Sequence, residues 1–221
     1  MRALILLVLL AACGRPLTMN EAALVDDLFG PSLDTQKIRL VGHAPLGSID
    51  VTLPPRPRVT CQERVLPART GPVTLNPAAL VAFNRVFLSE SWSLKDFVPG
   101  YPEAVNLYDV LLFAHEMTHV WQWQNRDRTG YHPLKAAAEH VRLDDPYLFD
   151  PGDTQPFLSY GYEQQASLVA EYTCCALLDP MGARTERLKA LISQDIPLGP
   201  LPPAQTFIAW PGAPRSGLCS E

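Results

Sequence analysis

The spacing of apolar residues predicts one helix near the start of the chain and several in its second half. Segment 19–29 follows Thr18-Met19-Asn20-Glu21, which has the spacing of a capping box, and it ends at Gly30-Pro31. The longest predicted helix, from Glu103 to Gln124, contains no Gly or Pro. Further helices are expected at about 133–143, 162–178 and 185–193.

Alternating polar and apolar residues predict short strands between the first helix and the others. The alternation runs through 37–41 and returns in 49–53, and we expect both strands to be antiparallel and at sheet edges. Six prolines between 54 and 77 leave room only for short strands such as 73–75, before a β-prone run at 83–89. The predicted fold class is therefore α+β: a small antiparallel or mixed sheet is followed by a helical half, with helix 103–124 at its centre.

The composition is that of one folded domain. The chain has 221 residues, of which 47% are hydrophobic and 19% charged, which excludes disorder as the main state. Its net charge of −5 offers no large basic surface, so we expect no nucleic-acid partner. No repeat or linker divides residues 13–221, which we expect to form a single domain ending in a proline-rich tail after Ile196.

The first residues have the pattern of a bacterial lipoprotein signal peptide. A positive Met1-Arg2 precedes eight apolar residues, too few for the roughly twenty that span a bilayer as a helix. The following Leu10-Ala11-Ala12-Cys13-Gly14 resembles a lipobox, which implies cleavage after residue 12 and lipidation of Cys13; the alternative is an ordinary signal peptide. Gly14 after the cysteine implies, by the sorting rule of such lipoproteins, an anchor in the outer membrane facing the periplasm.

The other four cysteines predict two disulfides, because the envelope is an oxidising compartment. A bridge between two adjacent cysteines would be strained, so the two isolated cysteines are each expected to join one of the adjacent pair. Which partner each takes stays open, and the rival interpretation is a cysteine metal site. The residues concerned are Cys61, Cys174, Cys175 and Cys219.

The strongest chemical signal is the HExxH pattern His115-Glu116-Met117-Thr118-His119 within the longest helix. Four residues are slightly more than one helical turn, so both imidazoles project from one face and can bind the same Zn²⁺. Glu116 is then placed to act as a general base on the water that the zinc activates. The alternative is a pair of core histidines bonded to backbone carbonyl groups.

A catalytic zinc site usually has a third protein ligand, and here it must come from downstream. The metzincin pattern is excluded, because Gln122 and Asn125 stand where that class needs Gly and His. Among carboxylates on predicted helices, Glu163 is our choice, since it opens a helix with the small residue Ala166 one turn later. The other candidates are Glu139, Glu171 and His140.

The segment His115-Glu-Met-Thr-His-Val-Trp-Gln122, followed by Glu163-Gln-Gln-Ala166, resembles small bacterial zincin metallopeptidase domains of the gluzincin type. Leu28-Phe29-Gly30 and Lys37-Ile38-Arg39 also resemble the opening of such zincin-like proteins, so that the resemblance covers about residues 19–175. It implies a zincin-like fold, His115, His119 and Glu163 as zinc ligands, and Glu116 as the general base. It also suggests that a strand at 85–91 pairs with an extended peptide substrate.

Other polar and aromatic residues near the motif are assigned more loosely. An oxyanion-stabilising side chain could come from several residues, none of which is preferred: Tyr131, His132, Tyr160 and Tyr162. Gln122 is either a hydrogen-bonding partner of a zinc ligand or a polar residue of the cleft. We expect Trp121 and Trp123 to serve packing.

The function expected from the sequence is that of a zinc-dependent metallopeptidase of the bacterial envelope, which hydrolyses amide bonds in a peptide or protein substrate. A second hypothesis is a noncatalytic zincin-fold envelope lipoprotein that acts as a binding or structural module. A third is a hydrolase of cell-wall amides. Glu116 favours an enzyme, because a purely structural metal site needs no base beside its ligands.

Overall fold

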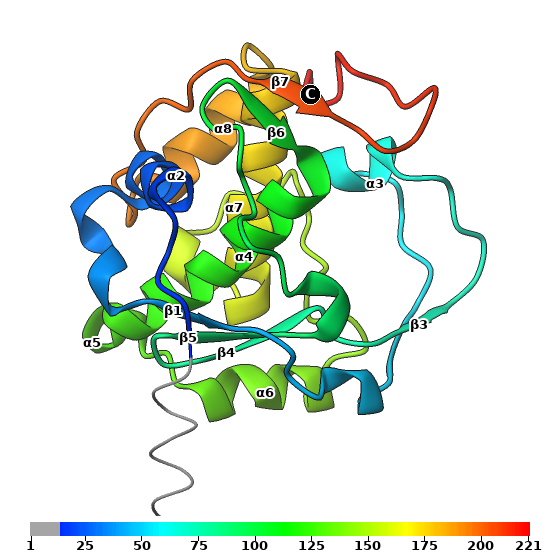
Figure 1. Ribbon diagram of the computed structural model, residues 1–221. Helices are drawn as coiled ribbons and strands as arrows, with labels where there is room; N and C mark the ends of the chain where they lie inside the picture. Colours follow the sequence, from blue (N-terminus) through cyan, green and yellow to red (C-terminus); the bar gives the residue numbers. More distant parts are fainter. Residues whose placement is uncertain (1–13) are drawn as a thin grey trace, which may run out of the picture.

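The computed structural model describes residues 14–221 (Figure 1). It has the predicted α+β architecture, in which a small mixed sheet is joined to a helical half. The signal peptide 1–12 and the lipidation site Cys13 lie outside the described residues. Within 14–221, no helix is long and apolar enough to cross a bilayer.

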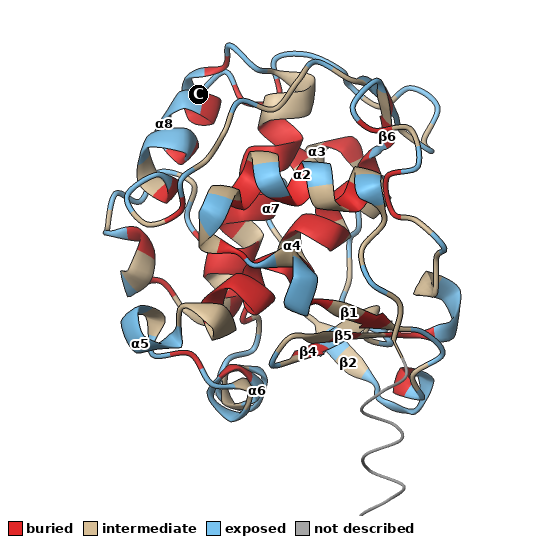
Figure 2. Cartoon of the chain, turned by 60° about the vertical axis from the view of Figure 1, so that its left-hand side comes forward, coloured by how far each residue is buried: buried red, intermediate tan, exposed pale blue. Residues whose placement is uncertain are grey.

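Two long helices form the centre of the molecule. Helix α4 (Leu107–Gln124) and helix α7 (Tyr162–Leu178) make the most extensive contact between any two described elements. Their buried residues form the red interior in Figure 2, which α2 (Met19–Phe29) and α8 (Ala183–Ile192) help to cover. The shorter helices are α3 (Cys61–Val65), α5 (Arg126–Thr129) and α6 (Pro133–Arg142).

The largest sheet has the strand order β1-β5-β4 and lies beneath α4 (Figure 1). Strand β5 (Arg85–Leu88) is central; β1 (Arg39–Val41) runs parallel to it, and β4 (Ala79–Ala82) antiparallel. The expectation that β1 is antiparallel is wrong, because residues 42–84 make a long excursion before β5, and such a crossover permits parallel pairing. Strand β2 (Val51–Leu53) pairs antiparallel with β3 (Val73–Leu75), as the alternation predicted.

The proline-rich tail supplies the last strand. Strand β7 (Gln205–Phe207) pairs in parallel with β6 (Ala104–Asn106), directly before α4. The central helix therefore begins at Leu107 rather than at Glu103, and the side chain of Asn106 caps it by accepting the Tyr108 N–H. Single 3₁₀ turns complete the elements, at Gly30–Ser32, Thr35–Lys37, Leu46–Ser48, Glu90–Trp92 and Phe157–Ser159.

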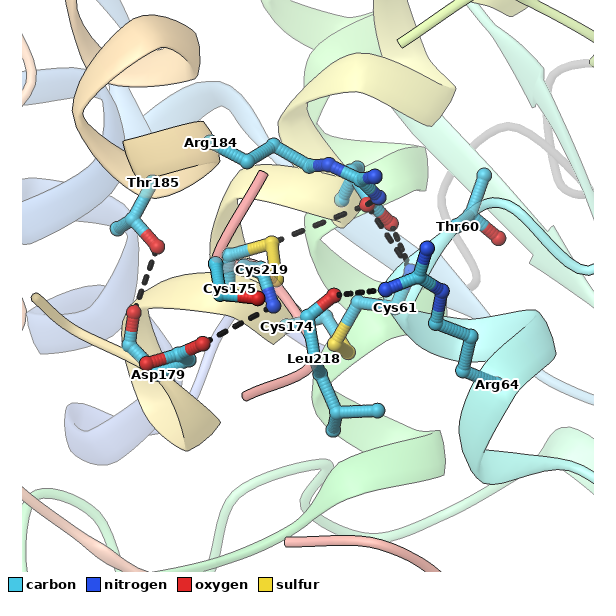
Figure 3. Close-up of a disulfide and its surroundings, with 12 residues drawn as sticks. Thr60, Cys61, Arg64, Cys174, Cys175, Asp179, Arg184, Thr185, Leu218 and Cys219 are labelled. Carbon is cyan, nitrogen blue, oxygen red and sulfur yellow. Dashed lines mark hydrogen bonds and ion pairs between the residues drawn. A yellow bond between two sulfur atoms is a disulfide. The ribbon is translucent and has the colours of Figure 1, made fainter. Parts of the chain in front are cut away.

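Two disulfides join segments that are distant in sequence (Figure 3). Cys61 is bonded to Cys174, and Cys175 to Cys219, so each isolated cysteine takes one of the adjacent pair, as predicted. The bridges attach α3 and the C-terminal tail to the second half of α7. Because they close separations of 113 and 44 residues, they remove much conformational freedom from the unfolded chain.

Candidate metal centre

Helix α4 carries the HExxH residues into the interior. Its apolar side chains are buried on nearly every side, and within this setting His119 is 5% exposed and Glu116 7%. Polar groups in such a place need partners, because an unpaired buried polar group costs stability. For the two histidines, the main charged partner is Glu163 of α7.

Glu163 lies in the first turn of α7, where the packing of α7 on α4 brings it against both imidazoles. Its Oε2 atom is 3.2 Å from Nε2 of His115 and 3.2 Å from Nε2 of His119. The two Nε2 atoms are also 3.2 Å apart. The three residues that the sequence singled out are therefore brought together, with one donor atom of each at the corners of a nearly equilateral triangle.

This triangle has the size that a tetrahedral zinc ion requires. Zinc binds His nitrogen and carboxylate oxygen at about 2.0–2.1 Å, and tetrahedral angles then place neighbouring ligand atoms about 3.3–3.4 Å apart. The observed separations of 3.2 Å need only a slight expansion. Two histidines and one glutamate are also the donor set of one class of catalytic zinc site, which leaves a fourth corner for water or substrate.

A buried amide network fixes the orientation of His119. Its Nδ1 donates to the side-chain oxygen of Gln122, at 2.9 Å, which directs Nε2 at Glu163 and His115. The Gln122 amide nitrogen in turn donates to the Tyr162 carbonyl and to Gln165 Oε1, both at 3.0 Å. Gln122 is thus a partner of the ligand, which was one of the two roles considered for it.

Helix α6 holds Glu163 from the other side. Nε2 of His140 lies 3.0 Å from Glu163 Oε1, the carboxylate oxygen that the other two histidines leave free. The adjacent Glu139 accepts hydrogen bonds from the backbone N–H groups of Tyr162 and Glu163, and so caps α7. Both residues were candidates for the third ligand, and in the structure both support Glu163 instead.

The remaining candidate, Glu171, belongs to another part of the molecule. It lies two turns further along α7, where its carboxylate accepts the Cys61 N–H and pairs with Arg184 at 3.1 Å. Its pKa is raised, mainly by burial. It therefore supports the disulfide region.

Burial and neighbouring ionisable side chains together set the pKa values of Glu163 and His119. Burial is the largest influence on Glu163 and raises its pKa, but the charge of His119 and hydrogen bonds from three histidines outweigh it and hold that pKa well below its ordinary value. Burial lowers the pKa of His119, yet the Glu163 carboxylate overcomes this and raises it to about 9. A proton on His119 therefore takes the place of a cation in the metal-free protein.

Glu116 has a different environment from Glu163. No hydrogen bond or ion pair joins its carboxylate to another described residue, and burial raises its pKa above the usual value for glutamate. A buried carboxylate with a raised pKa, next to candidate metal ligands, is suited to exchange a proton with a reacting group.

The aromatic residues around the site include one that the sequence analysis missed. Tyr131 stacks beside His119, with ring centroids 6.1 Å apart, whereas the hydroxyl of Tyr162 donates to the Gly130 carbonyl and His132 caps α6. The missed residue is Tyr147, whose ring centroid is 5.8 Å from that of His115 and 5.4 Å from that of His140. It lies in an irregular segment whose place no periodicity predicts.

A polar cleft of about 370 Å³ opens next to the site. Its walls are strand β2 with the preceding Asp50, and the C-terminal end of α6 with the residues that follow, including His140 and Asp144. The His140 side chain, which lines this cleft, is 31% exposed, and that of His115 is 15% exposed, so the site is partly accessible to solvent.

The strand proposed to pair with a substrate does not have a free edge. Strand β5, which forms the first part of segment 85–91, is hydrogen-bonded to β1 on one side and to β4 on the other. The prediction is therefore wrong, since strand addition needs an unpaired edge. Trp121 is fully buried and Trp123 packs on Phe83 and Arg126, as expected for packing residues.

Comparison with known proteins finds a relative of a different kind from the one expected. Over 165 residues, which are 73% of this chain, the sequence is 27% identical to the type VI secretion system spike protein VgrG2b of Pseudomonas aeruginosa. The chain is similar to VgrG2b. The match spans only 13% of the length of VgrG2b. Among solved structures, the effector domain of Pseudomonas aeruginosa VgrG2b is similar, with a TM-score of 0.49 and 24% identity, over 83% of this chain and 82% of that one. No family model matches the chain.

The relation to VgrG2b corrects the family and function inferred from the sequence. The resemblance to small bacterial zincin metallopeptidases is wrong, because the relative found is a secretion spike protein. The function inferred from that resemblance, a zinc metallopeptidase of the bacterial envelope, is therefore also wrong. The alternative of a noncatalytic zincin-fold lipoprotein gains no support either. The arrangement of His115, Glu116, His119 and Glu163 is independent of the family name and needs its own explanation.

Proposed function

We propose that this chain is an effector-type domain with a divalent-metal centre that catalyses hydrolysis. The observation that carries the proposal is the triangle of donor atoms from His115, His119 and Glu163, with sides of 3.2 Å. We assign these three residues as ligands of Zn²⁺. The relation to VgrG2b supports an effector-type role, because the similar solved structure is described as the effector domain of that spike protein.

Bound zinc would supply Lewis acidity, which polarises a substrate carbonyl group and makes water more acidic. Glu116 takes the proton from the attacking water and passes it to the leaving group, for which its raised pKa is suited. Gln122 keeps the Nε2 lone pair of His119 directed at the centre, and His140 holds the second oxygen of Glu163. Substrate would enter through the cleft beside His140.

Other parts of the sequence-based prediction remain proposals. The zincin-like arrangement, with the HExxH helix central, is proposed only as the local scaffold of the metal centre. Attachment to a membrane through a lipid on Cys13, in the outer membrane facing the periplasm, is proposed from the lipobox alone. Residues 13–221 are proposed to be one domain.

Metal analysis of purified wild type and variants tests the ligand set. We expect one zinc per chain in the wild type and in Glu116→Gln, and none in His119→Ala. Full zinc occupancy in His119→Ala would contradict the assignment.

Hydrolysis assays test the catalytic part of the proposal. Wild type and Glu116→Gln are compared on three chemically different substrates: an unfolded polypeptide, cell-wall fragments with amide crosslinks, and a carboxylic ester. We expect wild type to cleave at least one of them and Glu116→Gln to lose at least a hundredfold in rate, in the range that a general base contributes. Zinc binding with equal rates for the two proteins on all substrates would refute hydrolysis at this site.

A further inference from the structure

The four cysteines gather at a second place where metal-ligating atoms converge. The sulfur atoms of Cys61, Cys175 and Cys219 lie within 4.8 Å of one another, although Cys61 is bonded to Cys174 and Cys175 to Cys219. All four residues are fully buried. Cys174 follows Glu163 by eleven residues along α7, about 16 Å of helix, so this cluster is separate from the histidine centre.

The backbone of each cysteine is held in place by bonds other than the disulfides. The Cys61 N–H donates to both oxygens of the buried Glu171 carboxylate, at 2.9 Å. The Cys219 N–H donates to Asp179 at 3.0 Å, and its carbonyl accepts the Arg184 N–H at 3.0 Å.

Cys174 and Cys175 lie within α7 itself, between the two segments that carry the isolated cysteines (Figure 3). Close packing adds to these bonds, since a Cβ atom at Gly182 would clash with the Cys219 carbonyl oxygen. The four thiols should therefore stay together when the disulfides are reduced.

We propose that the reduced cysteine cluster binds one Zn²⁺ or another thiophilic divalent cation. Zinc binds thiolate sulfur at about 2.3 Å in tetrahedral sites, which places neighbouring sulfurs about 3.8 Å apart. The sulfurs of the three segments already lie within 4.8 Å, and Cys174 is bonded to one of them. The Sγ atom of Cys175 lies 3.8 Å from Oε1 of Glu171, and the guanidinium of Arg184 pairs with that oxygen at 3.1 Å, so its charge balances the carboxylate beside the cysteines.

The chemistry balances with a thioredoxin-class dithiol as reductant. Two dithiol molecules give four electrons and four protons to the two disulfides and become disulfides themselves, which leaves four thiols in the pocket. Metal binding then releases the protons of the thiols that become ligands. The mostly exposed segment 211–217, which leads to Cys219, gives a route for the reductant and the metal by local opening. The same pocket is thus closed by disulfides under oxidising conditions and by a metal under reducing conditions.

Cobalt titration of the full chain tests this proposal, because thiolate–Co²⁺ bonds give an intense near-ultraviolet charge-transfer band that His and Glu ligands do not give. Chelator-treated wild type, reduced with a phosphine under anaerobic conditions, should develop the band, and its amplitude should saturate when one Co²⁺ per chain is bound to thiolates. The band should vanish when Zn²⁺ is added. Disulfide-intact wild type is the matched control and should show no band.

The two metal centres can be told apart by stoichiometry. If the histidine centre also binds metal, the reduced chain takes two Co²⁺ and the oxidised chain one; if it does not, the numbers are one and zero. The Cys61→Ser/Cys219→Ser variant should lose the band under reducing conditions. A reduced wild type that shows no band, whether it remains folded or unfolds even with Zn²⁺ present, would overturn the proposal. Unfolding on reduction that Zn²⁺ reverses would support it.

Discussion

The hydrogen bond from His119 to Gln122 provides the sharpest test of how the metal centre is built. Replacing Gln122 with Leu keeps the volume but removes the acceptor for Nδ1–H and both amide donors. Partners of metal-ligating histidines are typically worth 10–100-fold in metal affinity, or about 1.4–2.8 kcal/mol. We therefore expect the dissociation constant for Zn²⁺ to rise by that factor in Gln122→Leu.

The same substitution also has a cost in stability, which must be separated from the effect on affinity. It leaves two buried polar groups, on His119 and Gln165, and the part-buried Tyr162 carbonyl without their partner, at about 1–3 kcal/mol for each buried group. The metal-free variant should thus lose about 3 kcal/mol or more of unfolding free energy. Denaturant unfolding in the presence of a chelator measures this loss.

Two further variants separate affinity from stability. Gln165→Leu removes a different part of the same network, the donors to Tyr160 and the acceptor for Gln122, without touching His119. It should lower stability and leave zinc affinity unchanged. Gln122→Glu keeps an acceptor for Nδ1–H and should also keep most of the affinity. Competition with a chromophoric chelator measures the affinities. Equal zinc affinity in Gln122→Leu and wild type would refute the claim that this amide orients a ligand.

Four other predictions follow from the contacts, a disulfide and the pKa directions. Glu163 raises the pKa of His119 from its ordinary 6.5 to about 9. The His119–Glu163 pair should therefore stabilise the metal-free fold fully below pH 6.5 and lose that contribution as the pH rises through about 9. Unfolding midpoints measured from pH 6 to 10 test this, and His119→Ala is the control in which this pH dependence should be absent. Zinc binding has the opposite dependence, since the metal must displace the proton, and affinity that does not increase with pH up to about 9 would contradict it. Glu139→Ala should cost about 1–2 kcal/mol by uncapping α7, measured by thermal unfolding, whereas Glu139→Asp should retain part of the cap. Cys61→Ser/Cys174→Ser should lower stability by at most about 5 kcal/mol under oxidising conditions, from the entropy of a loop closed over 113 residues, and no loss at all would contradict the buried bridge.

Those parts of the fold that depend on local pattern could be predicted from the sequence. The capping box at Thr18 and the uninterrupted periodicity of α7 predicted α2 and α7 with the bounds that the structure has. The start of α4 was misplaced because residues 104–106 form a strand, and their partner β7 is about a hundred residues away in a proline-rich tail. The direction of β1 likewise depends on a strand reached only after a long excursion.

The candidate site, like the fold, could be predicted only where it depends on local sequence pattern. The juxtaposition of His115, His119 and Glu163 could be anticipated, because two of the residues share one helical face and the third opens a helix that packs against it. The side chains that surround these three residues could not be anticipated in the same way. Neither the position of His140 on Glu163 nor that of Tyr147 beside two histidines has a signal in the spacing of residues, since both depend on how α6 and the following loop fold back. The family inferred from the motif was wrong for a related reason, because a motif of five residues describes local chemistry and leaves the relationship of the rest of the chain undecided.

Helix α7 connects the two proposed metal centres, and separate sets of contacts hold its first turn and its later turns in place. Its first turn is fixed by Glu139 and His140 of α6, while its later turns are fixed by the cysteines and by Glu171 with Arg184. Between these ends the helix packs along α4, which carries the two histidines. Because the first turn has its own cap and its own side-chain contacts, we expect the position of Glu163 in the folded chain to be independent of the state of the cysteine pocket about 16 Å away. We therefore expect the histidine centre to keep its geometry in both the disulfide and the thiol forms of the cysteine pocket. The oxidation state of the cysteines should change the free energy of unfolding of the chain but not the assembly of the histidine centre.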